Sequence, residues 1–316
     1  MKFEDYKLEI PDRDPVSEEN FDIETWREEN PIDYLKALHL IAKQHSIQKF
    51  AFDTIFKVLK LYLPNILYKY YSLNENMDLN NQKFETIKNQ KIYTAETKAL
   101  NDPFEGKAFY YDPNKLMKFK PLDKVDGHLI DDFSDYVRIA SLTGNGTDSM
   151  PMWAHYANNH KGFCVSYDLS ENINLELRSV TFPVQYTNKR IDITSIMEHT
   201  VINILNRISS STVNQIMLDD MLMIYAPIFL SNIKHDFWNY ENEFRITVGN
   251  DKNMKYINAI PKAFFLGIKC EKKNRERLQE IAVDLKIPVY EMFYDDMDDN
   301  FKLSKRQIYP LLDFKL

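Results

Sequence analysis

The sequence predicts an α+β protein with a mixed, mostly antiparallel central sheet flanked by helices and with a helical N-terminal extension. Short β-type runs fill the middle and end of the chain, and helix-type runs flank them. No glycine occurs before Gly106. Because glycine commonly marks turns and bulges, its absence over the first third favours helix there.

The N-terminal region, residues 1–62, is expected to combine an acidic arm with a helical extension. Residues 1–28 are acidic and contain two prolines, which favours irregular or extended backbone. A helix is predicted to begin at Asn30-Pro31, with asparagine as the cap, and to break near His45-Ser46. We expect this region to cap the core, to inhibit it or to contact a regulatory partner through residues 1–60.

The rest of the chain, residues 63–316, is expected to form the core domain. The predicted strands are 67–72, 91–95, 136–142, 162–167, 180–186, 244–248, 263–268 and 288–293. The predicted helices are 76–90, 150–160, 191–236 and 271–286, with Pro227 expected to kink or break the third. This order indicates a sheet with helices on its faces and no internal repeat.

Composition argues against several classes of function. The net charge is -7, so no global positive field would attract nucleic acid or an anionic membrane, although the 40 lysines and arginines leave room for a local basic groove. The N-terminus lacks an apolar signal region, and no stretch approaches the roughly 18 apolar residues of a membrane span. We therefore expect a cytoplasmic protein.

Cys164 and Cys270 form no disulfide framework, and Cys164 is expected to be an inert core thiol.

Glycine-dependent and metal-dependent chemistries lack their motifs. Neither a Walker loop nor a dinucleotide-binding glycine pattern is present. There is no HExxH, and His155 and His160 are spaced five apart, which separates the two rings on a helix. The acidic run at 295–299 lacks the glycine and distal glutamate of a calcium loop and is expected to be a solvated turn. We therefore expect no metal.

Two polar segments in the middle of the chain are candidates for a site. Asn101 and Asp102 precede a proline in strong turn chemistry, so they belong either to an ordinary loop or to a rigid turn beside a pocket. Trp153 and Tyr156 share a helix face just before a predicted buried strand. His155 is a candidate catalytic residue, although a lone histidine beside aromatic residues is more often structural.

The strongest candidate is the pair Glu241 and Glu243. Residues two apart on a strand point to the same face, so both carboxylates are expected to lie side by side, with Arg245 extending that face. Like charges this close raise at least one pKa unless a cation compensates, and Arg245 is the predicted cation. The alternative is a solvent-facing strand edge with an ordinary ion pair. The surrounding aromatic residues, including Trp238, argue against that alternative.

Several motifs resemble those of a widespread bacterial family of unknown function. They are NDPFEG, SLTG, MWAHYANNHKGFCVSYD, WNYENEFRITV and FFLGIKCEKKNRERLQEIA, in the order of that family, within residues 66–310. Family members often carry arginine where this chain has Tyr71. The bacterial character of the family makes a toxin or a phage-defence effector the expected biological setting.

The order of polar elements is also similar to that of ADP-ribosyltransferases. The corresponding elements are Lys69 or Tyr70 on an opening strand, then Ser141-Leu142-Thr143, then Glu241-Asn242-Glu243. This resemblance implies NAD as co-substrate and an activity as a transferase or an NAD glycohydrolase. The acceptor would be a protein, a nucleic acid or water, and neither a membrane partner nor a metal is expected.

The resemblance also implies roles for the residues. Glu243 would stabilise the positive charge that develops as the nicotinamide–ribose bond breaks, and Glu241 would orient or deprotonate the acceptor. Ser141 and Thr143 would hold the ribose or a neighbouring strand. An aromatic residue, Tyr70 or Tyr156, would stack on nicotinamide.

Two other functions stay open. One is a non-catalytic binding or sensor module in which the same motifs form a structural core. The other is a hydrolase or nuclease that uses Glu241, Glu243 and Asp102 with Mg²⁺, which requires carboxylates converging from several elements. The sequence does not reveal whether they converge.

Overall fold

A nine-stranded, mostly antiparallel sheet forms the centre of the protein. The computed structural model describes residues 22–43, 48–170, 172–210, 221–297, 299 and 301–310. The strand order of the sheet is β15 (Leu303–Tyr309), β14 (Val289–Tyr294), β13 (Pro261–Leu266), β6 (Phe163–Asp168), β1 (Ile66–Tyr71), β5 (Val137–Thr143), β11 (Glu243–Gly249) and β7 (Thr181–Pro183), with β3 (Ala95–Glu96) paired to β5 beside this path. Within this sheet only β13 and β14 pair in parallel. The predicted α+β class is confirmed.

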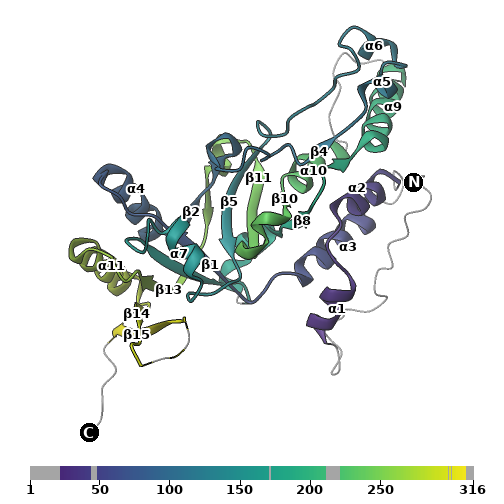
Figure 1. Ribbon diagram of the computed structural model, residues 1–316. Coiled ribbons are helices and arrows are strands. Elements are labelled where there is room, and N and C mark those ends of the chain that lie inside the picture. The colour runs from purple at the N-terminus through teal and green to yellow at the C-terminus, as the bar shows by residue number, and fades with distance from the viewer. Residues whose placement is uncertain are drawn as a thin grey trace.

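Three helices cover one face of the sheet. They are α4 (Met77–Lys88), α8 (Leu175–Val180) and α11 (Lys272–Leu285), and α4 and α11 lie together at the left of Figure 1. Their buried side chains, such as Phe84 and Leu278, join alternate residues of the strands, such as Val165, in the largest apolar core. Burial of such a side chain stabilises the fold by about 1.5–3 kcal/mol. A smaller core under α7 (Met150–Tyr156) covers the opposite face around Trp153.

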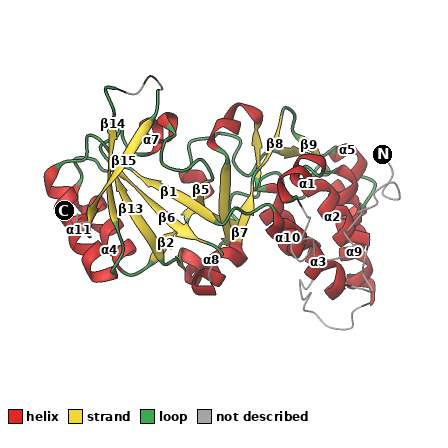
Figure 2. Cartoon of the chain, turned by 90° about the horizontal axis from the view of Figure 1, so that it is seen from below, coloured by secondary structure: helices red, strands yellow, loops and turns green. Residues whose placement is uncertain are grey.

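The N-terminal helices share a separate core with residues much later in the chain. This helical unit contains α2 (Tyr34–Lys43), α3 (Gln48–Leu61), α5 (Pro113–Leu116), α6 (Lys120–Asp123), α9 (Thr194–Ser210) and α10 (Met221–Leu230). The short helix α1 (Ile23–Glu29) precedes this unit and has no buried residue. The helical unit lies to the right of the sheet in Figures 1 and 2. The Tyr34 ring packs 5.2 Å from Phe229, and its hydroxyl donates a hydrogen bond to the Pro183 carbonyl at 2.6 Å. The predicted extension is therefore packed against residues of the core domain.

Short strands and single-turn helices complete the fold. The two-stranded pairs are β10 (Ile233–His235) with β8 (Gln185–Thr187), β12 (Tyr256–Asn258) with β2 (Lys91–Tyr93), and β4 (Phe109–Tyr110) with β9 (Ile191–Asp192). The 3₁₀ turns are η3 (Thr97–Ala99), η4 (Asn172–Asn174), η5 (Asp236–Glu241) and η6 (Lys252–Lys255). Such elements are too short to show a periodic pattern of apolar residues, so the sequence does not predict them.

The predicted start of the first helix is wrong. Asn30 ends α1 as its C-cap, and α2 begins at Tyr34. Asp33 supplies the cap instead, since its carboxylate accepts a hydrogen bond from the Lys36 amide at 2.9 Å. Asp22 caps α1 in the same way, so residues 22–28 are not an irregular arm. The rest of that predicted arm, up to residue 21, and the predicted break at His45-Ser46 lie outside the described residues.

The predicted helix over 191–236 is also wrong in detail. It begins and ends with the short strands β9 and β10, with α9 and α10 between them, and residues 211–220 lie outside the described residues. Pro227 lies inside α10, which continues to Leu230. A proline removes one helical hydrogen bond. Burial of Leu222, Phe229 and Leu230 in the helical core offsets that loss. Likewise, the predicted strand 180–186 divides into β7 and β8, which pair with different partners.

The sheet is split between β1 and β5. These strands are aligned at one position only, Tyr68 with Thr143. Beyond this position β1 pairs only with β6 and diverges from β5. Further along the same edge of β5, β3 pairs with Ile139 and Arg138. The stretch of β5 between these two pairings is left open on this edge, and this gap positions the candidate site.

The backbones of β1 and Gly162, which directly precedes β6, lie very close together on one side of the split. A Cβ at this position would lie 2.0 Å from the Tyr71 carbonyl oxygen, so Gly162→Ala requires β1 and β6 to shift. We expect a loss of about 1–3 kcal/mol in the free energy of unfolding, measured by urea titration. Gly249→Ala is the matched control, because nothing lies within 4 Å of its Cβ, and it should be neutral. Equal midpoints for both variants would contradict the expected clash.

Candidate functional site

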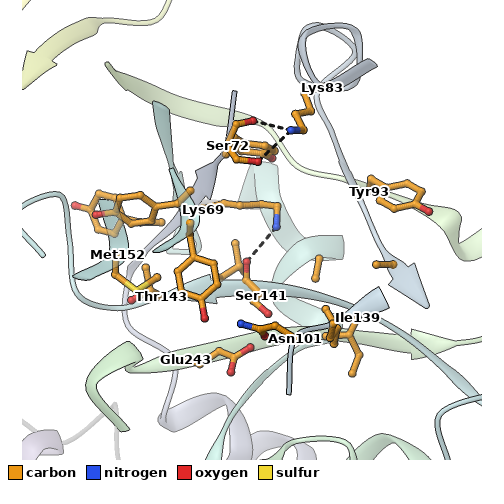
Figure 3. Close-up of a pocket in the computed structure, with 18 of the residues that line it drawn as sticks. Lys69, Ser72, Lys83, Tyr93, Asn101, Ile139, Ser141, Thr143, Met152 and Glu243 are labelled. Carbon is orange, nitrogen blue, oxygen red and sulfur yellow. Dashed lines mark hydrogen bonds between the residues drawn. The ribbon is translucent and has the colours of Figure 1, made fainter. Parts of the chain in front are cut away.

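A cavity of about 590 Å³ opens where β1 and β5 separate. Residues 68–72, at the end of β1, and residues 139–143 of β5 form two of its walls. Residues of α4, of α7, of the region around β2, of the loop 100–105 and of the segment 234–243 also line it. Figure 3 shows Lys69 reaching across the gap toward Ser141 and Glu243 lying beyond them. Polar groups from widely separated segments thus meet in one hollow.

Glu243, the first residue of β11, is held by two cations. Its carboxylate accepts hydrogen bonds from Arg245 Nε at 2.9 Å and Nη2 at 3.1 Å, and from Lys234 Nζ at 3.0 Å. Burial alone would raise the pKa of Glu243, but Arg245 and then Lys234 outweigh it and lower that pKa to about 2. Glu243 is therefore ionised at neutral pH although it is only 4% exposed.

Glu241 lies beside Glu243 for a different reason from the one predicted. It ends η5, outside the strand, and Asn242 then takes a left-handed conformation (φ 43°) before β11 begins. Lys234 bridges the two carboxylates, since its Nζ also donates to Glu241 Oε2 at 2.7 Å. The Tyr156 hydroxyl donates to the other Glu241 oxygen. The predicted pairing along one strand face is therefore wrong, although both carboxylates line the cavity.

Arg245 connects this pair to a third buried carboxylate. Its guanidinium is fully buried and donates to both oxygens of Glu105, at 2.7 and 2.6 Å, and to the Ser231 carbonyl at 2.6 Å. A bidentate arginine–carboxylate pair of this kind is geometrically specific. Through Arg245, this network fixes the position of the Glu243 carboxylate.

The other wall of the split carries a buried lysine. Lys69 Nζ donates to the Ser141 carbonyl at 3.2 Å, on the part of the β5 edge left open by the split. Burial lowers the pKa of Lys69 to about 8, although the nearby Glu243 opposes this shift. The Ser141 side chain in turn hydrogen-bonds to Glu243 and helps to keep its pKa low.

Four more of the predicted residues lie around Glu241 and Glu243. Thr143 Oγ1 donates to the Glu241 carbonyl at 2.6 Å and so holds the chain before β11. Asn101 and Tyr156 line the cavity beside the carboxylates. Tyr70 also lines it, with its hydroxyl donating to the Gly146 carbonyl at 2.7 Å.

Four predicted residues do not line the cavity, and one of them, Arg245, is the fully buried member of the ion network described above. His155 is exposed, and its ring lies 6.4 Å from that of Tyr240. Asp102 is buried and accepts a hydrogen bond from the Phe104 amide at 2.9 Å, which is the ordinary role of this turn. Trp153 is fully buried in the core under α7, where it donates to the Thr147 carbonyl at 2.7 Å. Local hydrogen bonds and packing thus account for the positions of the two buried residues, Asp102 and Trp153.

Sequence reasoning missed Lys234, Glu105 and several residues of the cavity wall. Lys234 is 4% exposed and lies four residues after the apolar run that ends at Leu230, so a lysine close to a buried segment was the available signal. Glu105 was visible only as part of a turn motif. The other missed lining residues include the polar and aromatic side chains Lys83, Tyr93, Lys255 and Tyr256.

In the described part of the chain, no helix is both long and apolar enough to cross a bilayer. Over the same residues, no three His, Cys, Asp or Glu side chains converge in a way that would hold a metal ion. Cys164 and Cys270 are free and buried, and burial raises the pKa of each thiol.

The fold and site define an α+β protein with a charged cavity in a split sheet. Residues 152–246 match a family described as a protein of unknown function, DUF2971. No curated protein and no solved structure gives a significant match. The matched segment runs from α7 into β11 and contains Tyr156, Lys234, Glu241, Glu243 and Arg245. The family description carries no activity.

Proposed function

We propose that this protein binds NAD in the cavity between β1 and β5 and breaks its nicotinamide–ribose bond, as an ADP-ribosyltransferase or an NAD glycohydrolase. One observation carries the proposal. An ionised, rigidly held Glu243 lines a cavity of about 590 Å³ together with Ser141 and Tyr156. The biological setting that we propose is a bacterial toxin or phage-defence effector.

The chemistry requires a fixed negative charge near the reacting ribose carbon. As the C1′–N bond breaks, its electron pair returns to the nicotinamide ring, and positive charge spreads over C1′ and the ring oxygen, as in glycoside cleavage. A carboxylate held by Arg245 and Lys234 needs no reorganisation to stabilise that charge. Glu241 would orient the attacking water or acceptor hydroxyl and take its proton.

Tyrosines provide a surface for the planar base. Tyr156 lines the cavity with its hydroxyl fixed by Glu241, and Tyr70 contributes a second aromatic side chain. Aromatic rings favour stacked or edge contacts with another ring, each worth about 0.5–1.5 kcal/mol. The acceptor, whether protein, nucleic acid or water, is left for experiment to identify.

The test is consumption of NAD by the purified protein. Nicotinamide release is followed by chromatography, and transfer is followed with labelled NAD in extracts of uninfected and phage-infected bacteria. We expect release of nicotinamide in at least one of these conditions. Absence of both nicotinamide and labelled product in all of them would overturn the proposal.

The pH dependence of NAD binding provides a further prediction. With a pKa of about 8, the Lys69 amine is charged below pH 8 and neutral above it. Because the charged form adds a favourable electrostatic interaction with the anionic ligand as a whole and the neutral form does not, affinity should fall as the pH rises through about 8. The groups that act on this amine, Glu243, Lys83 and the Tyr71 ring, stay unchanged in Lys69→Arg. Arginine keeps its charge, so a flat profile over this range is expected for the variant in calorimetric titrations.

A second candidate function is a non-catalytic binding or sensor module. Both oxygens of Glu243 are already engaged by Arg245 and Lys234, which is typical of a structural ion network as well as of an active site. In this case Glu243→Gln lowers stability while the folded fraction keeps its biological effect. Loss of effect from a folded variant argues for catalysis instead.

A further inference from the structure

The two ends of the cavity differ in how their charges are paired, because Lys234 and Arg245 already neutralise the glutamates at one end. Glu241 and Glu243 lie at one end, and Lys83 and Lys255 line other parts of the wall. Figure 3 shows Lys83 and Ser72 across the cavity from Glu243, with Lys69 between them. In the described part of the chain, neither Lys83 nor Lys255 forms an ion pair with a carboxylate. An elongated ligand with an anionic part would therefore bind in one direction.

Lys83 is aimed into the cavity by the face of α4. Leu79, Gln82, Lys83 and Thr86 all line the cavity, and their spacing places them on one side of the helix. Lys83 Nζ donates to the Ser72 carbonyl at 2.6 Å and to the Ser72 hydroxyl at 3.2 Å. An ammonium group has three donors, so these contacts leave capacity for an anionic oxygen. Burial lowers the pKa of Lys83, and an anionic oxygen bound beside the amine would raise this pKa again.

Two exposed tyrosines stand at the same end of the cavity as Lys255. Tyr93 on β2 and Tyr256 on β12 meet edge to face, with ring centroids 5.6 Å apart, and are 44% and 43% exposed. Lys255 Nζ lies 5.7 Å from the first ring and 6.0 Å from the second. An exposed aromatic ring beside a cation is a stacking surface for a nucleobase attached to a phosphate.

We propose that Lys83 and Lys255 bind the diphosphate of an adenosine diphosphate group whose base stacks on Tyr93 or Tyr256. The direction of the ligand, with its distal ribose toward Glu243, rests on the proposed function. The diphosphate and base subsite itself requires no catalysis. It is therefore open to test with ADP and ADP-ribose, which lack the bond to be broken.

The experiment is calorimetric titration of the full chain with ADP-ribose and with ADP. Each charge-assisted contact to phosphate supplies roughly a tenfold gain in affinity, so Lys83→Gln/Lys255→Gln should weaken both ligands by about 100-fold. Tyr93→Ala/Tyr256→Ala should weaken them by about tenfold or more. Lys83→Arg/Lys255→Arg retains the charges and should bind.

The matched control is Lys91→Gln/Lys252→Gln. These exposed lysines lie on β2, which carries Tyr93, and on η6, which carries Lys255, but they do not line the cavity. Their replacement removes the same amount of charge. This control should bind as the unmodified protein does. Thermal unfolding of every variant separates loss of binding from loss of folding.

The results distinguish this subsite from catalysis. Equal affinity in the glutamine pair and in the control, or no binding of either ligand to the unmodified protein, would overturn the subsite. If no NAD is cleaved but the glutamine pair alone loses ADP-ribose, the subsite stands and the proposed activity fails. If NAD is cleaved with an unchanged KM in the glutamine pair, the activity stands and the subsite fails.

Discussion

Replacing Arg245 with methionine is expected to lower the free energy of unfolding by about 3–5 kcal/mol, the range for removal of one partner from a buried ion pair. The guanidinium is fully buried and is the main partner of Glu105 and a partner of Glu243. Without it, two carboxylates must stay desolvated with fewer donors or take up protons. Guanidinium or urea titration at pH 7 measures the change in midpoint.

The matched control is Arg277→Met on α11. Arg277 also contacts two carboxylates, Glu85 at 3.1 Å and Glu280 at 3.2 Å, but its side chain is 43% exposed. Ion pairs in solvent contribute about 0–1 kcal/mol, so this variant should be nearly neutral. If the two arginine variants unfold at the same denaturant concentration, the buried network does not stabilise the fold as argued.

A double variant separates loss of the pair from loss of one charge. Glu105→Gln removes a buried negative charge, so adding it to Arg245→Met should cost less than the sum of the two single changes. A strictly additive result would mean that Glu105 and Arg245 are not coupled, in conflict with their two hydrogen bonds of 2.7 and 2.6 Å.

Elements with strong local signals were predictable. The predicted strand 162–167 and helix 271–286 correspond to β6 and α11 within one residue at each end. A short apolar run marks the first, and helical periodicity ended by Lys286 in a left-handed conformation marks the second. Local sequence determines such elements, so a single chain suffices to find them.

The split that creates the cavity could not be predicted in this way. It depends on where β1 stops pairing with β5 and where β3 takes the vacated edge, and both are contacts between segments far apart in sequence. The same limit applies to the helical core, where Tyr34 packs against Phe229. Periodicity reports which face of a segment is buried, but it does not report which segment covers it.

Only those parts of the candidate site that lie close together in sequence were predictable. Spacing indicated that Glu241 and Glu243 lie close together, and the cation at Arg245 was visible two residues later. Lys234 bridges both glutamates from β10, and neither spacing nor composition places it there. Glu105, which fixes Arg245, comes from a loop 140 residues earlier in the chain.

Replacing Glu243 with glutamine is expected to reduce NAD cleavage by about 10²–10³-fold, the range for removal of one preorganised electrostatic group. The amide has a similar shape but carries no charge, so it cannot stabilise the positive charge that develops at the ribose. Because this stabilisation arises in the transition state, kcat should fall while KM changes little. Steady-state rates of nicotinamide release measure both constants.

Asp168→Asn is the control for this variant. Asp168 is another buried carboxylate that pairs with a lysine, Lys262, but it does not line the cavity. It should keep the full rate once the folded fraction is equal. Glu243→Asp tests position as well as charge, since the shorter side chain keeps the charge but withdraws it from the cavity, and an intermediate rate is expected. If the glutamine variant is folded and turns over NAD at the rate of Asp168→Asn, then Glu243 is a structural member of the ion network and the chemistry must be sought elsewhere in the cavity.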